Sequence, residues 1–197
     1  MDSDACVFEV ASTQHGFFTR VQALDCGFTD DKLAYHARTG RFKIVHRGVY
    51  RYRDYPSSPF EPMVAAWLAV GKDKSVISHE SALSLHELSD VIPNEVHLTV
   101  PRTSHNQPKL RNVRIHTTTR TFGPSDIVWK EGMLVTSVAR TVVDASEKGT
   151  GPEQIEMAVH HALTRGLSTP RRFREAASER SLRVRRLVER ALDMSAS

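Results

Sequence analysis

The N-terminal part of the chain shows three short runs of hydrophobic side chains at helical spacing, and each run ends at a glycine. Residues 7–14 form the first run. Thr19 and Thr29 are placed to cap two further helices, which the sequence predicts over residues 20–25 and 29–39. Short helices joined by tight glycine turns are typical of a helix-turn-helix core.

After Gly40 the pattern changes to the alternation of a β-hairpin. The alternating apolar positions are Phe42, Ile44 and Val49. The basic positions between them are Arg41, Lys43 and Arg51. One face of the hairpin is therefore expected to be apolar and the other basic, with the turn at residues 46–48. Helices followed by a hairpin predict a winged helix-turn-helix DNA-binding domain over residues 1–55.

Positive charge is concentrated in the same segment. Residues 32–53 hold seven Lys or Arg and no acid, whereas the whole chain carries a net charge of only +4. In the third helix, Leu33 and Ala37 are expected to face the core, which leaves the opposite side for DNA. Asp30 and Asp31 would repel phosphates, so we expect the helix middle and the hairpin to make the backbone contacts. The candidate DNA-binding residues are Lys32, Tyr35, His36, Arg38, Arg41, Lys43, His46, Arg47 and Arg51.

Residues 56–197 are expected to form a second domain of mixed α/β type. Helical spacing predicts helices over residues 59–70 and 80–88, followed by strand patterns. The predicted strands cover residues 95–100, 113–117, 127–129 and 133–135. We therefore expect an α+β protein: the winged helix, an α/β core over residues 56–148, and a helical, arginine-rich tail over residues 149–197.

The tail is the second basic region of the chain. Residues 171–190 hold eight arginines, no lysine and three glutamates. Guanidinium groups pair with carboxylates or phosphates in bidentate fashion, so this surface could hold an acidic partner or a second stretch of DNA. A solvated helical surface explains the same pattern equally well. The candidate partner-binding residues are Arg171, Arg172, Arg174, Arg183, Arg185 and Arg186.

No catalytic, metal or cofactor site is expected. His79 and His86 miss the spacing that places two histidines on one helical face, and His97 and His116 would meet only if their strands lie side by side. Arg140 and Asp144 are four residues apart on a predicted helix, and an ion pair is their simplest interpretation. The region after Glu147 has no strand with paired acids, as a metal-dependent nuclease would need.

The two cysteines and the N-terminus indicate a cytoplasmic protein. Cys6 and Cys26 lie far apart in the sequence, so we expect reduced thiols and neither a disulfide nor a zinc site. The first residues lack the pattern of a signal peptide, and no apolar run approaches the roughly 20 residues of a membrane span. We expect no contact with a membrane.

Several strings in this order resemble a known family. The strings are QHGFFTRVQALDCGFT, RFKIVHRGVYRY, SHESALSLHEL, EVHLTVPR, VRIHTT and MLVTSVARTVVDAS. Together they cover roughly residues 7–148 and resemble the AbiEi-type antitoxins of bacterial toxin–antitoxin systems. In that family the winged helix binds inverted repeats in the operator and represses its own operon, while the rest of the chain neutralises a nucleotidyltransferase-type toxin.

The resemblance implies a non-enzymatic antitoxin and autorepressor that binds double-stranded operator DNA as a monomer or a dimer. It also implies a DNA-facing role for Lys32, Tyr35, His36, Arg38, Arg41, Lys43, Arg47 and Arg51. Two alternatives stay open. The second domain could sense a ligand in an ordinary transcription regulator, or it could be an enzyme that covalently modifies the toxin.

Overall fold

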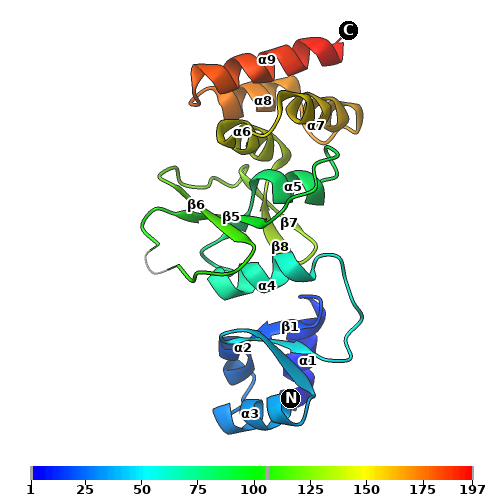
Figure 1. Cartoon of the computed structure of the whole chain (residues 1–197), viewed down its shortest axis with the longest axis vertical. Helices are drawn as coiled ribbons and strands as arrows, with labels where there is room; N and C mark the ends of the chain where they lie inside the picture. The colour runs from blue at the N-terminus through cyan, green and yellow to red at the C-terminus, as the bar shows by residue number, and fades with distance from the viewer. Residues whose placement is uncertain (1, 105–106, 197) are drawn as a thin grey trace.

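The computed structural model describes residues 2–104 and 107–196. The molecule is elongated and has its elements stacked in tiers, with the chain termini near opposite ends (Figure 1). The N-terminal helices and a small sheet form one end, a larger sheet lies in the middle, and a layer of helices forms the other end. The predicted α+β class is confirmed.

The N-terminal unit has the element order of a winged helix-turn-helix. Its elements are α1 (Ser3–Ser12), β1 (Phe17–Thr19), α2 (Arg20–Asp25), α3 (Asp30–Arg38), β2 (Phe42–His46) and β3 (Val49–Tyr52). The strands form an antiparallel sheet in the order β1-β3-β2. The predicted caps are present, because the hydroxyls of Thr19 and Thr29 accept hydrogen bonds from the first turns of α2 and α3. Strand β1 was not predicted, and α1 begins at Ser3 instead of residue 7.

Both faces of this small sheet carry buried hydrophobic side chains. One face packs under the helices of the N-terminal unit, where the rings of Phe18 and Phe42 meet edge to face at 4.9 Å. The other face carries Phe17 and Val49 and belongs to the same hydrophobic core as the first helix of the next unit. The core therefore continues across the predicted domain boundary at residue 55.

The assignment of Val49 to the face of Phe42 is wrong. Lys43 pairs with Arg51 and Ile44 pairs with Tyr50, and a bulge then shifts the register before His46. Val49 therefore lies on the same face as Arg51, which is the face that packs against α4. Ile44, predicted to be on the apolar face, is exposed near the hairpin end.

The two cysteines form a disulfide, so the expectation of reduced thiols is wrong. Cys6 on α1 and Cys26 at the end of α2 have their Cα atoms 5.6 Å apart. Their separation of 20 positions in the sequence gave no indication of this pairing. The packing of α1 against α2 brings the two side chains together.

The middle tier is a mixed five-stranded sheet in the order β6-β5-β4-β8-β7. Its elements are α4 (Glu61–Val70), β4 (Val76–Ile77), α5 (His79–Leu85), β5 (Val96–Pro101), β6 (Val113–Thr118), β7 (Ile127–Lys130) and β8 (Met133–Thr136). Strands β5 and β6 are parallel, as are β4 and β8, whereas the other neighbours are antiparallel. Helix α4 lies between the winged helix and this sheet, and α5 lies beyond the sheet's opposite face (Figure 1).

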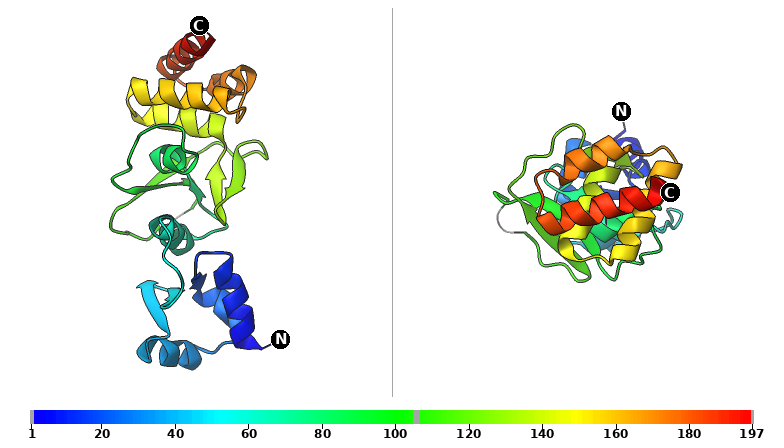
Figure 2. Two further views of the ribbon diagram at one scale, coloured as in Figure 1. Left: turned by 90° about the vertical axis from the view of Figure 1, so that its right-hand side faces the viewer. Right: turned by 90° about the horizontal axis from the view of Figure 1, so that it is seen from above.

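The far tier consists of α6 (Val138–Lys148), α7 (Pro152–Thr164), α8 (Pro170–Ala177) and α9 (Leu182–Ala196). Apolar side chains of all four helices and of α5 form one core, which includes Leu83, Val142, Ile155, Phe173 and Val188. Seen along the long axis, the red helix α9 crosses the end of the molecule (Figure 2, right). In the described part of the chain, none of the helices combines the length and apolar character needed to cross a bilayer.

Candidate functional site

Helix α3 lies at the end of the molecule farthest from the C-terminus (Figure 1). Buried Leu33 anchors the helix, and Ala34, Tyr35 and Arg38 are exposed. Tyr35 is 53% exposed, and the Arg38 guanidinium lies 5.9 Å from the centre of its ring. This face offers DNA an aromatic ring and a guanidinium on a helix narrow enough for the major groove.

Two predicted groove-facing residues, Lys32 and His36, are half-buried and make contacts within the protein. The Lys32 ammonium lies 2.5 Å from an Asp4 carboxylate oxygen and 4.1 Å from the centre of the Phe28 ring. The His36 ring packs 5.1 Å from the ring of Phe42, and burial lowers its pKa. The α3 side of these residues turns toward α1 and the aromatic core, which helical periodicity around Leu33 did not reveal.

Asp4 of α1 holds two of the predicted DNA-binding cations. One carboxylate oxygen contacts Lys32 at 2.5 Å, and the other contacts the Arg41 guanidinium at 2.5 Å. The hydrogen bond from Lys32, together with Arg41, lowers the pKa of the Asp4 carboxyl against the opposing effect of burial. Both cations therefore already have a carboxylate partner in the free protein.

The acidic start of α3 is also neutralised. The Arg20 guanidinium binds the Asp30 carboxylate through two hydrogen bonds of 2.5 and 2.7 Å. The pKa of Asp30 is lowered, first by this hydrogen bond. The repulsion of phosphates expected from Asp30 is thus offset by a neighbour from α2, which the sequence pattern did not indicate.

The hairpin residues divide into two groups. Arg47 is exposed at the turn beside Gly48, whose φ of +74° requires the left-handed conformation that glycine adopts freely. Lys43 and His46 line a crevice of about 310 Å³ between the hairpin and the next unit, together with Arg111. Arg47 at the tip of the hairpin therefore has an exposed side chain outside this crevice.

Arg51 is not on the DNA-facing surface, and this prediction is wrong. The residue is 8% exposed, and its guanidinium lies 2.7 Å from a Glu61 carboxylate oxygen of α4. It also donates hydrogen bonds to the carbonyl oxygens of Tyr52, Tyr55 and Pro56. Arg51 therefore joins the winged helix to the middle tier.

Arg53 is a basic residue of this region that the candidate set missed. It is exposed, and its Nε donates a hydrogen bond to the Gly40 carbonyl oxygen just after α3. Its position in the basic segment of residues 32–53 could have indicated it from the sequence. It extends the positive edge at the C-terminal end of α3.

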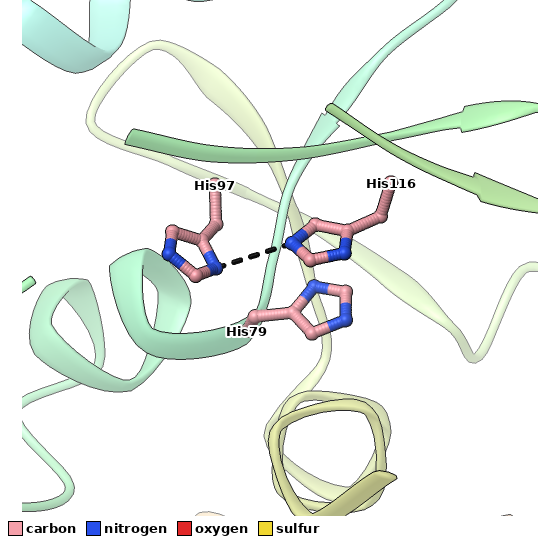
Figure 3. A group of neighbouring side chains, drawn as sticks. All are labelled: His79, His97 and His116. Atoms are coloured by element: carbon pink, nitrogen blue, oxygen red, sulfur yellow. Dashed lines mark hydrogen bonds between the residues drawn. The ribbon is translucent and has the colours of Figure 1, made fainter. Parts of the chain in front are cut away.

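A cluster of three histidines lies in the middle tier, on the side of the sheet that faces the helical layer (Figure 3). His79, His97 and His116 are 4%, 7% and 9% exposed. His116 Nε2 lies 3.2 Å from His97 Nδ1, and the His79 ring stacks on the His116 ring at 3.7 Å. His97 and His116 do meet across neighbouring strands, and His79 joins them, whereas His86 contacts the Thr136 carbonyl oxygen outside the cluster.

The backbone explains the meeting of the three rings. In the parallel pair of β5 and β6, Thr99 is opposite His116, and His97 is two residues before Thr99 and so shares its face. His79 begins α5 with a left-handed φ of 52°. Its Nδ1 lies 2.8 Å from the Ser78 hydroxyl, which also accepts a hydrogen bond from Thr99.

All three imidazoles are neutral near pH 7. Burial, together with the neighbouring His116 and His97, lowers the pKa of His79 to about 2. Burial and the neighbouring His97 lower the pKa of His116 to about 4. The pKa of His97 is also lowered, mainly by burial.

A cavity of about 220 Å³ adjoins His79 and His116. It is bordered by a buried ion-pair network, in which Asp144 accepts from Arg140 at 2.9 Å and from Arg180 of the loop before α9. The predicted pair of Arg140 and Asp144 is therefore present and buried. The contact of Arg180 with Asp144 links α6 to the helical tail.

The arginines of the tail differ in their surroundings. Arg171 pairs with Glu175 at 2.7 Å and Arg174 pairs with Glu189 at 3.1 Å, all four on the surface. Arg183 donates to the carbonyl oxygens at the end of α6. The exposed arginines for which the described residues provide no ion-pair or hydrogen-bond partner include Arg172, Arg185 and Arg186.

The element order and sheet of the N-terminal unit define a winged helix-turn-helix. Residues 7–53 match the family model described as "Transcriptional regulator, AbiEi antitoxin". The resemblance to AbiEi-type antitoxins is therefore confirmed for the winged helix. The match to the family model ends at residue 53 and does not include the second unit.

Almost all of this chain shares its fold with a solved structure, that of the RV2827C protein from Mycobacterium tuberculosis. The similarity covers 99% of this chain and 78% of that chain, with a TM-score of 0.62 and 12% sequence identity. A search of curated proteins gives no match to this chain.

Proposed function

We propose that this chain is an AbiEi-type antitoxin and transcriptional repressor that binds double-stranded operator DNA through α3 and the tip of the hairpin. The observation that carries the proposal is the exposed face of α3 at the free end of the molecule. The family model over residues 7–53 supports the same role. This role places the protein in the cytoplasm, where reducing conditions act on the disulfide.

The residues proposed to touch DNA fall into two kinds. Tyr35 and Arg38 project from α3 and would reach base edges in the major groove. Arg47 at the hairpin tip and Arg53 would bind phosphates, because both guanidiniums are exposed. Arg41 would join them by exchanging its Asp4 carboxylate for a phosphate.

The proposed operator is an inverted repeat, because one winged helix reads one half-site. A dimer or two monomers bound side by side would satisfy this symmetry. Each winged helix would repress the operon of the protein itself by occupying its promoter.

The second unit, residues 56–197, is proposed to neutralise a nucleotidyltransferase-type toxin. The surface of α8 and α9 supports this role, since Arg172, Arg185 and Arg186 present exposed guanidiniums. Guanidinium groups suit an acidic surface of a partner protein. No residue of the chain is proposed to act as a catalyst.

A ligand-responsive regulator is a second candidate. A cavity of about 450 Å³ between the sheet and the helical layer falls in the size range of small-molecule sites. It is lined by aromatic and charged side chains that include Trp129, Asp126 and Arg140. A ligand held there would contact both tiers.

The test of DNA binding is fluorescence anisotropy with the DNA upstream of the gene. We expect Arg38→Ala and Arg47→Ala each to weaken binding about 5- to 100-fold, and to reduce the slope of log affinity against log salt by about 1 where a phosphate contact is lost. Arg185→Ala on α9 is the matched control and should bind normally. Unchanged affinity in both test variants would refute the proposed surface.

The test of toxin neutralisation is co-expression with a nucleotidyltransferase-type toxin, taken from the neighbouring gene if that gene encodes one. A chain with Arg38 and Arg47 changed to alanine should still restore growth but no longer repress a reporter. Simultaneous change of Arg172, Arg185 and Arg186 to glutamate should keep repression and lose rescue. A chain that rescues growth normally with all three charges reversed would exclude this arginine surface as the toxin-binding site.

A further inference from the structure

The three buried histidines have the donor arrangement of a metal site. One ring nitrogen from each of His79, His97 and His116 lies within 4.8 Å of the other two, and the pair from His97 and His116 is 3.2 Å apart. In a tetrahedral zinc site with bonds of about 2.0 to 2.1 Å, ligand nitrogens lie about 3.3 Å apart. Two of the three ligands are thus already at the required separation.

We propose that His79, His97 and His116 bind one Zn²⁺ ion through three imidazole nitrogens, with a fourth position open to the adjoining cavity. Imidazole is a preferred ligand of zinc, and a set of three histidines with one open position is a known type of zinc coordination. This site is independent of the proposed DNA-binding surface, because it belongs to a different tier of the molecule.

The alternative, a set of histidines that merely fills the core, leaves two features without a purpose. A buried imidazole is usually satisfied by hydrogen bonds from the protein. Here His97 and His116 share one hydrogen bond with each other, while the His79 ring stacks on the His116 ring and its Nδ1 lies 2.8 Å from the Ser78 hydroxyl. The second nitrogen of each ring has no hydrogen-bond partner among the described residues. In addition, His79 adopts a left-handed φ of 52°, a conformation that is costly for a residue with a Cβ atom and that collects at functional sites.

Only side chains need to move for the ion to bind. The His79 ring is tilted 19° from the His116 ring, so it must rotate about its side-chain bonds until its nitrogen points to the same centre as the other two. The proton between His97 and His116 must move to the other nitrogen of the ring that carries it. Three neutral imidazoles then offer three lone pairs, and no proton is released.

The cavity next to the cluster favours an anion or water as the fourth ligand. Its wall includes Arg120, Arg140, Lys148 and Arg180 against Asp144 and Glu147. Asp144 is already bound by two of these arginines. The buried Nε of Arg180 has no hydrogen-bond partner among the described residues. This N–H group could therefore donate a hydrogen bond to an anion or water in the cavity.

The test uses the complete, tag-free and oxidised chain, so that no free thiol competes for metal. After removal of metal with a chelator, calorimetric titration with Zn²⁺ should show one ion per chain. Titration with Co²⁺ should produce the intense visible absorption of a four-coordinate ion. His97→Gln and His116→Gln should each weaken Zn²⁺ binding at least about 100-fold, beyond the effect of losing an outer partner.

His86→Gln is the matched control, because His86 is equally buried but bonds to a carbonyl oxygen outside the cluster. It should bind Zn²⁺ as the unaltered chain does. Absence of one-to-one binding in the unaltered chain overturns the proposal, as does unchanged affinity in His97→Gln and His116→Gln. If these variants fail to fold, Co²⁺ in the unaltered chain must shift the NMR ring-proton signals of exactly these three histidines, and shifts elsewhere refute the site.

Discussion

The carboxylate of Asp4 lies 2.5 Å from the guanidinium of Arg41, and its other oxygen lies 2.5 Å from the ammonium of Lys32. An acid from the first helix thereby holds two cations at the edge of the proposed DNA surface. Any phosphate that binds Arg41 must compete with this carboxylate. The free protein is therefore less attractive to DNA than its basic sequence suggests.

Asp4→Asn should strengthen DNA binding. The substitution frees Arg41 and Lys32 from a competing negative charge, so we expect affinity to rise about 3- to 10-fold at low salt and less at high salt. Anisotropy titrations at two salt concentrations measure the effect. Glu9→Gln removes an exposed acid from the same helix and should change affinity less, and an equal gain in both variants would show that only net charge matters.

Arg51→Ala should destabilise the fold and not alter which DNA sequence is bound. The change leaves the Glu61 carboxylate without its buried partner, which costs about 3 kcal/mol of unfolding free energy. Urea denaturation measures this loss. Lys43→Ala, on the neighbouring strand but exposed, should stay within about 0.5 kcal/mol of the parent.

Loss of the disulfide should weaken the winged helix. Replacing Cys6 and Cys26 by serine opens a loop of 20 residues, for which the chain-entropy model gives about 3 kcal/mol. The midpoint of thermal unfolding should fall, and a reducing agent should lower the midpoint of the parent but not that of the double variant. A parent that melts identically with and without reductant would contradict this contribution.

Acid should destabilise the metal-free protein through the histidine cluster. The unfolded chain takes up protons near pH 6.5, whereas the folded-state pKa is about 4 for His116 and about 2 for His79. The stability from these neutral rings is therefore complete above pH 6.5 and is lost as the pH falls toward 4. Each ring adds up to about 1.4 kcal/mol per pH unit to the slope. Denaturation between pH 7 and 4.5 should show a shallower slope for His116→Gln than for the control His160→Gln, which removes an exposed histidine of α7.

The local signals in the sequence predicted the winged helix well. Thr19 and Thr29 cap helices where expected, because capping depends on a few neighbouring residues. Strands β1 and β4 were missed because each is very short and depends on pairing with distant segments. The direction of single side chains on α3 was also misjudged, since α1 supplies Asp4 and draws Lys32 away from the outer face.

The histidine cluster and the disulfide share a different reason for escaping prediction. His79, His97 and His116 come from a helix start and two strands, so no fixed spacing connects them. Cys6 and Cys26 likewise meet only after two helices have packed. Sites assembled from separate elements become visible when the topology is known.

The sheet of the winged helix packs against α4 through Phe17, Val49 and the ion pair of Arg51 with Glu61. Rotation of the winged helix relative to the middle tier would open this shared core and separate that ion pair. The winged helix therefore has a fixed orientation relative to the middle tier. A partner bound to α9 would lie at the end of the molecule opposite the operator, in one defined orientation relative to the DNA.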